Sequence, residues 1–375
     1  MAKRPLKSVA DVSKREPSSD SGPHDYDAMV VVSFGGPESP ADVLSFLENV
    51  FKGLRVSDET KHRIAARYHS FGGVSPINAH TRTFIAALKE ALDKRGPALP
   101  IYWGNRNWHP LLTDTVAQMA NDGIRRAIAY VTSTFSSYSS CRKYREDLYE
   151  AAAAVPNAPL IDRLRAGFNH PGFIAAASDQ VTTALDAIPA QRRANTPILF
   201  TAHSLPESMA RHCAYETQLH EACQLVGDAL EHQRWRLVYQ SNNASYGKEA
   251  WLGPDVRDAL SAVHAEGAED VVVAPIGFVC DHMEVVLDLD VDAAQRAREV
   301  GINMIRAGTV GAHPAFVEMV RELIVERMTP EPQRRALGGL GPSHDLCPAD
   351  CCLSGRPAPA KPALGGVDSP DFERA

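Results

Sequence analysis

The sequence predicts an α/β fold with two similar, doubly wound, Rossmann-like domains whose parallel sheets face each other across a cleft. Short apolar runs alternate with helical stretches, which is the pattern of parallel sheets built from βαβ units. The chain also repeats itself: Pro110 and Pro254 each open a helix that closes at a glycine, Gly123 and Gly267, and both pairs are 144 residues apart. At 375 residues the chain exceeds the size of one core, so two domains are expected.

The expected strands lie where apolar runs rich in β-branched residues fall. They are Met29–Ser33, Ile101–Gly104, Ala127–Thr132, Pro197–Thr201, Leu237–Ser241, Val271–Ile276 and Met304–Gly308. The helical stretches between them include Ala79–Lys94 and Pro206–His232. Residues 1–26 predict a disordered N-terminal tail, 27–165 the first domain and 166–330 the second. Residues 331–375 form a C-terminal extension that carries a cysteine cluster and ends in a disordered tail.

The charge and hydropathy of the chain argue against several classes of partner. The formal net charge is −7 and the isoelectric point about 6.1, whereas nucleic acids and anionic membranes bind basic faces. No apolar stretch reaches the roughly 18 residues of a membrane span, and the N-terminus lacks the apolar core of a secretory signal. No glycine-rich phosphate loop follows a strand, which disfavours a nucleotide-binding enzyme. We therefore expect a cytoplasmic protein that binds a small molecule.

Two buried apolar runs end abruptly in polar residues. The segment Pro197–Pro206 delivers His203, and the segment Ala274–Glu284 delivers Glu284. Ligands collect beyond the carboxyl ends of parallel strands, so we expect both side chains to face one crevice. A neutral imidazole and a carboxylate can each bind a divalent metal or accept a proton, although a lone histidine at a strand end can also be a core residue bonded to a carbonyl.

Glu284 begins a row of acids spaced by four, with Asp288 and Asp292. On an ideal α-helix three such residues spread over about 80° of one face, and a π-type turn would bring them closer into line. The segment Leu287–Asp292 also alternates strictly between apolar and acidic residues, which leaves an exposed edge strand or a solvated helix face as alternatives.

Five motifs, in this order along the chain, resemble those of the ferrochelatase family. They are Ser33–Glu38, Gly72–Pro76, Ala202–Pro206, Trp251–Asp255 and Phe278–Glu284. The resemblance runs from about Met29 to Arg327 and implies a chelatase-like fold and a lyase that inserts Fe²⁺ into a porphyrin for heme biosynthesis. It also implies that His203 acts at the porphyrin centre as an iron ligand, a proton acceptor or both, and that the acidic row lies beside it.

The resemblance further implies how the porphyrin carboxylates are bound. Propionate contacts fall on the positions Arg67, Tyr68, Ser75 and Tyr138, and the chain resembles actinobacterial members that use coproporphyrin III. Iron insertion would then give iron coproporphyrin. Where several bacterial members carry a tyrosine that reaches the metal, this chain has Phe34, which cannot ligate iron.

Two other functions stay open at this stage. One is a protoporphyrin IX ferrochelatase, and the other is a porphyrin-binding carrier or sensor that has lost the insertion activity. The expected partners are the porphyrin substrate, an iron donor and the enzyme that takes the product.

The C-terminal extension gathers three of the seven cysteines, Cys347, Cys351 and Cys352. Three thiols beside a polar tail most simply indicate a metal or iron–sulfur site, because exposed thiols otherwise invite oxidation. The family resemblance implies an internal fourth ligand at Cys141 and a [2Fe–2S] cluster, while zinc and incidental thiols remain alternatives. The other three cysteines, Cys213, Cys223 and Cys280, are expected to be buried.

Overall fold

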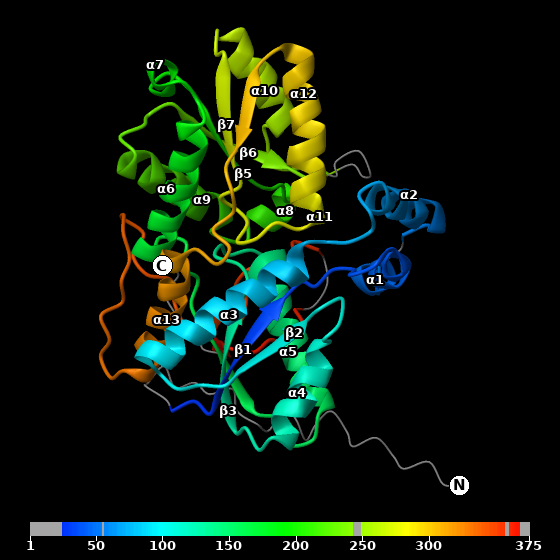
Figure 1. The fold of residues 1–375 in the computed structure, drawn as a ribbon. Helices are drawn as coiled ribbons and strands as arrows, with labels where there is room; N and C mark the ends of the chain where they lie inside the picture. Colours follow the sequence, from blue (N-terminus) through cyan, green and yellow to red (C-terminus); the bar gives the residue numbers. More distant parts are fainter. Residues whose placement is uncertain (1–24, 55, 243–248, 357–359, 368–375) are drawn as a thin grey trace.

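The computed structural model describes residues 25–54, 56–242, 249–356 and 360–367. Two four-stranded parallel sheets form its two halves, drawn with the first below the second in Figure 1. The first sheet has the strand order β2-β1-β3-β4 and the second has the equivalent order β6-β5-β7-β8, so the predicted fold class is confirmed. The strands are β1 (Ala28–Ser33), β2 (Ile101–Asn105), β3 (Arg126–Val131), β4 (Leu160–Arg163), β5 (Ile198–His203), β6 (Trp235–Gln240), β7 (Asp270–Ala274) and β8 (Asn303–Arg306).

Helices cover both faces of each sheet. The helices of the first half are α1 (Val43–Val50), α2 (Asp58–His69), α3 (Ile77–Arg95), α4 (Leu112–Asn121) and α5 (Lys143–Ala154), of which α1 and α2 pack on each other beside the sheet (Figure 1). The second half contains α6 (Pro171–Asp186), α7 (Ala190–Arg193), α8 (Glu207–Ala210), α9 (Tyr215–Ala229), α10 (Val256–Ala265), α11 (Met283–Val285), α12 (Ala294–Val300) and α13 (Pro314–Met328). A short 3₁₀ turn, η2 (Pro40–Asp42), and two π-helical segments, η3 (Tyr138–Arg142) and η5 (Val286–Ala293), complete the helices.

The two halves share one hydrophobic core. Along β1, Met29 and Val31 belong to this shared core, whereas the alternate residues pack on the other face of the sheet. Phe200 of β5 lies in the same core, and Phe316 of α13 contacts Phe84 and Phe173 at ring-centroid distances of 6.0 and 6.2 Å. Helix α13 packs against α3 of the first half and α6 of the second. The carboxyl ends of the two sheets are therefore held in a fixed relation.

The structure supports the internal repeat. Helices α4 and α10 begin and end 144 residues apart, as the prolines and glycines of the sequence predict. The Asn105 amide donates to the Pro110 carbonyl at 2.7 Å, and the Tyr239 amide donates to the Pro254 carbonyl at 2.8 Å. Each half also has a π-helical segment after its third strand, η3 in the first and η5 in the second. The two segments supply different side chains from equivalent places.

Strand β4 and the region of helices α8 and α9 differ from the sequence prediction, and so do the two short strands of the C-terminal extension. Strand β4 was not expected, because Leu160–Arg163 is short and half polar; its Asp162 pairs with Arg126 at 2.8 Å. The helix expected over Pro206–His232 is broken into α8 and α9. At the break, the His212 carbonyl accepts a hydrogen bond at 3.2 Å from the Cys352 amide, so the C-terminal extension uses a carbonyl that a continuous helix would bond internally.

The chain ends were predicted as tails, and most of those residues, 1–24 and 368–375, lie outside the described part. Tyr26 is buried, and its hydroxyl donates to Asp162 at 3.1 Å. In the C-terminal extension, β9 (Cys347–Pro348) pairs with β10 (Gly366–Val367), and the Leu364 amide donates to the Arg145 carbonyl at 3.1 Å. Among the described helices, none is both long and apolar enough to cross a membrane.

Candidate functional site

The carboxyl ends of the second sheet bring His203 and Glu284 together, as the sequence predicts. His203 is the last residue of β5, and Glu284 lies in α11 after β7. The imidazole Nδ1 lies 2.5 Å from the Ser204 carbonyl, which only accepts, so Nδ1 carries the proton. The other nitrogen, Nε2, lies 3.7 Å from the Glu284 carboxylate. Both side chains are partly exposed, at 31% and 51%, so a bound molecule can reach them.

The acidic row continues from Glu284 through the π-helical segment η5. Asp288 and Asp292 both lie in this segment, so the segment is a helix and not an edge strand. A π-helical turn holds more residues than an α-turn, which brings positions four apart closer to one line. The acids of the predicted row therefore lie closer to one line than they would on a regular α-helix.

Asp288 is the least exposed acid of the row, at 17% against 51% for Glu284 and 38% for Asp292. Its carboxylate accepts a short hydrogen bond from Ser241, which follows β6 with a left-handed φ of 58°. Burial raises the pKa of Asp288 to about 6, with a smaller increase from Glu284 and opposing effects of the Ser241 hydrogen bond and nearby cations. A carboxyl with this pKa can take up and release protons near neutral pH.

Arg67 joins the two halves at this site. It belongs to α2 of the first half, and its guanidinium lies 2.9 Å from Asp292 and 3.9 Å from Asp288. Its neighbour Tyr68 packs against Phe46 at a ring-centroid distance of 5.9 Å, and burial, reinforced by Glu284, raises the pKa of the phenol. The structure thus brings two of the four predicted propionate contacts to the acidic row.

The other two predicted propionate contacts engage partners within the first half. Ser75 is 5% exposed, and its amide donates to the Pro37 carbonyl at 2.9 Å. A Cβ on Gly36 would lie 2.7 Å from the Ser75 Cβ, so only glycine fits there without displacement. The Tyr138 hydroxyl donates to Glu146 at 3.1 Å.

Phe34 directly follows β1, and its ring contacts one aromatic and one charged side chain. Its ring meets Phe46 edge to face at 6.2 Å, and the Arg106 guanidinium lies 5.6 Å from its centroid. No atom of this side chain can bind a metal.

His282 is a candidate that the sequence analysis did not single out, although it lies inside the Phe278–Glu284 motif. It precedes α11 as its N-cap residue, and its ring meets that of Phe278 at 5.2 Å. Burial lowers its pKa, while Glu284 raises it and His203 lowers it, which places His282 near both. The sequence did contain a signal for His282, because this imidazole lies only two residues from the candidate Glu284 in the same seven-residue motif.

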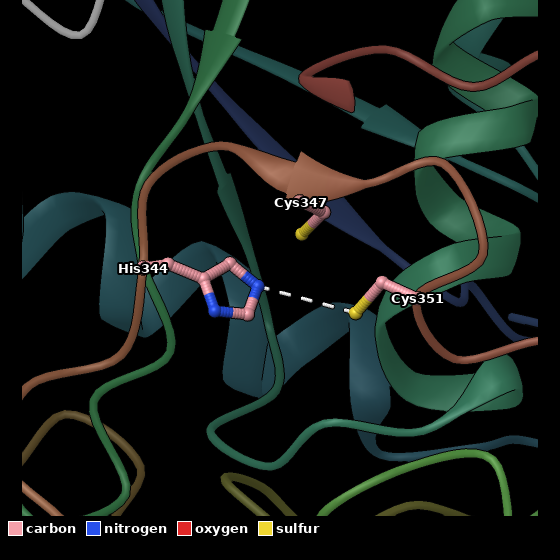
Figure 2. Close-up of side chains that lie close together, drawn as sticks. All are labelled: His344, Cys347 and Cys351. Carbon is pink, nitrogen blue, oxygen red and sulfur yellow. Dashed lines mark hydrogen bonds between the residues drawn. The ribbon is translucent and has the colours of Figure 1, made fainter. Parts of the chain in front are cut away.

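A second site is built from the cysteines. The possible ligand atoms of His344, Cys347 and Cys351 lie within 4.8 Å of one another (Figure 2). The Cys351 sulfur is 3.9 Å from His344 Nε2 and 3.4 Å from the Cys352 sulfur. Cys141, in η3, shares a hydrogen bond with Cys347. The four predicted cysteines are therefore linked by successive contacts, Cys141 to Cys347 and Cys352 to Cys351, while Cys347 and Cys351 also lie near His344. His344 is a donor that reasoning from thiols alone did not include.

The remaining cysteines lie outside the predicted ligand set. Cys223 and Cys280 are buried, as expected, whereas Cys213 is half-buried. The Cys213 thiol lies 3.4 Å from the Ala210 carbonyl, and burial raises its pKa to about 11.

The surroundings of the cysteine site favour an anionic group. Arg145 and Arg163 are 1% and 8% exposed, and the Arg163 guanidinium donates to the Cys347 sulfur at 3.5 Å. Among the described residues, Arg145 Nη1 and Arg163 Nε have no hydrogen-bond partner. Hydrogen bonds from Cys141 and Cys351, aided by Arg163, lower the pKa of the Cys347 thiol. Four thiolates around a metal or a [2Fe–2S] cluster would place negative charge beside these two buried guanidinium cations. The donor set therefore fits such a group.

Comparison with known proteins points to one family. The sequence model of the ferrochelatase family matches residues 26–328. A ferrochelatase of Rhodopirellula baltica is 51% identical over 343 residues, covering 91% of this chain and 96% of its own. Coproporphyrin III ferrochelatases of Streptomyces griseus and Frankia alni are 44% and 48% identical, covering 93% and 92% of this chain and 98% and 90% of theirs.

Proposed function

The chain belongs to the ferrochelatase family, and we propose on this basis that it inserts Fe²⁺ into coproporphyrin III to give iron coproporphyrin in heme biosynthesis. The observation that carries the proposal is the approach of His203 Nε2 to the Glu284 carboxylate at the head of an acidic row. The Streptomyces and Frankia relatives are named for coproporphyrin III as their substrate.

Iron insertion requires that Fe²⁺ sheds water, that two pyrrole protons leave and that the macrocycle bends. Because Nδ1 of His203 donates to the Ser204 carbonyl, Nε2 is the nitrogen that can face a porphyrin. It can accept one pyrrole proton or bind the incoming iron, and Glu284 can take the other role. The overall change releases two protons for each Fe²⁺ bound, so the site needs a route for protons to leave.

The acidic row provides that route in our proposal. Glu284 stands beside His203, and Asp288 follows with a pKa raised to about 6 by burial. A carboxyl with this pKa can take up a proton and release it again near neutral pH. Asp292 continues the row to the half-exposed Arg67.

Arg67 is the residue that we assign to a substrate carboxylate at the cleft edge. Its ion pair with Asp292 is partly exposed on both sides, and such pairs contribute only about 0–1 kcal/mol. A propionate can therefore replace Asp292 at little cost. Coproporphyrin III has four propionates and protoporphyrin IX has two, so the polar set of Arg67, Tyr68, Ser75 and Tyr138 suits the tetracarboxylate better.

We also propose that Cys141, Cys347, Cys351 and Cys352 hold a [2Fe–2S] cluster, with His344 as a fifth donor beside them. The buried Arg145 and Arg163 support an anionic centre at this place. When bound, the cluster would supply a redox-active centre and a covalent link between the C-terminal extension and η3. A structural zinc ion is the alternative, because Cys₃His is also a common zinc ligand set.

The thiol site, with none of its cysteines in a disulfide, supports an assignment to the reducing cytoplasm. Within heme biosynthesis, an iron donor and the enzyme that consumes the iron porphyrin are the proposed partners.

The function is tested by anaerobic incubation of the protein with Fe²⁺ and coproporphyrin III. We expect the absorption bands of the free porphyrin to be replaced by those of the iron complex at a rate proportional to protein concentration. Tight porphyrin binding without this change would instead support a carrier or sensor. The name of the Rhodopirellula relative, ferrochelatase, specifies no porphyrin. Protoporphyrin IX is therefore assayed as a second substrate under the same conditions.

A further inference from the structure

A buried chain of side chains connects the cysteine site to Tyr138. The Arg142 guanidinium donates from Nη1 to the carbonyls of Ala349 at 2.6 Å and Cys351 at 3.4 Å. Its Nε donates to Glu146 Oε1 at 3.3 Å, and the Tyr138 hydroxyl donates to Glu146 Oε2 at 3.1 Å. One carboxylate, through Arg142, therefore joins Tyr138 to the 347–352 loop, which carries three of the cysteines.

The central pair of this chain is almost completely enclosed. Arg142 and Glu146 are 3% and 2% exposed. The guanidinium also donates from Nη2 to the Lys361 carbonyl at 2.8 Å. A buried charged donor that loses its acceptors is strongly unfavourable, so Arg142 has to follow these carbonyls when the loop moves. Glu146 has to follow Arg142 for the same reason, because it cannot remain buried without its ion pair.

Tyr138 and the cysteine site also share one backbone segment. The π-helical segment η3 begins at Tyr138 and contains both Cys141 and Arg142. It follows β3, in the place where the second half carries Glu284 and the acidic row after β7. A change at Cys141 is thus only three residues from the hydroxyl that we assign to a porphyrin propionate.

We propose that Arg142 and Glu146 are positioning residues that transmit the state of the cysteine site to the Tyr138 hydroxyl in the porphyrin cleft. With the thiols bound to a metal or cluster, the 347–352 loop is fixed and Glu146 holds the hydroxyl in place. Without it, the loop carbonyls shift, the carboxylate turns with Arg142, and Tyr138 loses its acceptor, so its one hydroxyl proton becomes available to a porphyrin propionate. The inference rests on the proposed function for the identity of the ligand, but its first step does not involve the porphyrin.

The first measurement follows Tyr138 without any porphyrin. The full chain is labelled with 3-fluorotyrosine at position 138, loaded anaerobically with Fe²⁺ and sulfide, and then stripped with a chelator. We expect the ¹⁹F resonance to shift on stripping and to return on reloading. In a Glu146→Gln variant, which keeps the side-chain shape and loses the ion pair, the resonance should be the same in both states.

The second measurement is the dissociation constant for metal-free coproporphyrin III. We expect stripping to strengthen binding about tenfold in the parent protein, because the released Tyr138 hydroxyl can donate to a propionate, and to change binding less than about twofold in Glu146→Gln, because the relay is already broken. The matched control is Glu326→Gln, which neutralises another buried carboxylate paired with an arginine, Arg165, at 2.7 Å. This control should keep the parent's dependence on loading.

The outcomes separate the relay from the proposed function. A Tyr138 resonance that ignores stripping, or that moves equally in Glu146→Gln, would overturn the relay even if coproporphyrin binds tightly. A resonance that responds as expected in a protein that binds no porphyrin would support the relay and contradict the proposed function.

Discussion

Arg67 and Asp292 form an ion pair of 2.9 Å that joins helix α2 of the first half to the π-helical segment η5 of the second. The pair closes one edge of the site that contains His203 and Glu284, and it connects a candidate substrate contact to the candidate proton route. Both partners are partly exposed, so the pair is weak enough to exchange for a ligand.

Replacing Arg67 should weaken substrate binding more than it slows chemistry. We expect Arg67→Met to raise KM for coproporphyrin III about tenfold, the loss of roughly one charge-assisted contact, with kcat changed less than about threefold. Steady-state insertion kinetics test this. The control is Lys61→Met on the same helix, because the ion pair of Lys61, at 3.0 Å, is with Asp58 of the helix itself. An unchanged KM in Arg67→Met would remove this residue from the substrate site.

Asp288 should make the folded protein less stable as the pH rises. Its pKa is raised to about 6 in the folded state, above the usual value near 4, so its contribution is favourable below about pH 4 and is lost between about pH 4 and 6. Asp288→Asn keeps an acceptor for Ser241 and removes the titration. Relative to the parent, it should gain about 1–2 kcal/mol of unfolding free energy between about pH 4.5 and 7.5. Urea unfolding of both proteins at about pH 4.5 and 7.5 checks this. If the difference in unfolding free energy between variant and parent is the same at the two pH values, burial does not raise the pKa of Asp288.

The cysteine site should hold iron and sulfide through Cys141 as well as the C-terminal thiols. The protein purified anaerobically should be reddish-brown and contain about two irons and two sulfides per chain. Cys141→Ser should bleach the colour and lower the melting temperature, because ligation stabilises the folded state only. Cys213→Ser, at a half-buried thiol outside the group, should keep the colour. A colourless parent with one zinc per chain would favour the zinc alternative.

The porphyrin preference should follow the number of carboxylates. We expect a higher kcat/KM for coproporphyrin III than for protoporphyrin IX, because Arg67 and its neighbours offer more anchors than two propionates use. Anaerobic insertion assays with both porphyrins under the same conditions compare them directly. A reversed preference would favour the protoporphyrin alternative while leaving iron insertion in place.

The sequence predicted the fold well where local pattern and packing agree. Apolar runs located seven strands because buried parallel strands are continuously hydrophobic. The eighth strand of the two sheets, β4, was missed because it contains two charged residues. Their partners are distant in the sequence: Asp162 pairs with Arg126, and Arg163 donates to the Cys347 sulfur. Such pairing has no local signature in the sequence.

The candidate site was predictable to the same extent. Strand ends and spacing marked His203, Glu284 and the acids as candidates, whereas the choice of a row over an edge strand rested on the resemblance to the ferrochelatase family. The π-helical segment was named beforehand only as one geometry that would align the acids. The partners of those residues do not follow. The contact of Arg67 with Asp292 spans 225 positions, and that of Arg142 with Cys351 spans 209, so only the folded chain reveals them.

The most direct test of the account is the insertion rate of His203→Ala. The imidazole is partly exposed at the end of β5 and contributes chemistry more than packing, so the variant should fold and bind coproporphyrin III like the parent. We predict that its anaerobic Fe²⁺ insertion rate falls below about one tenth of the parent rate, a barrier increase of at least ~1.4 kcal/mol. A folded, porphyrin-binding variant that inserts iron faster than this would contradict the assignment of His203 to the reaction.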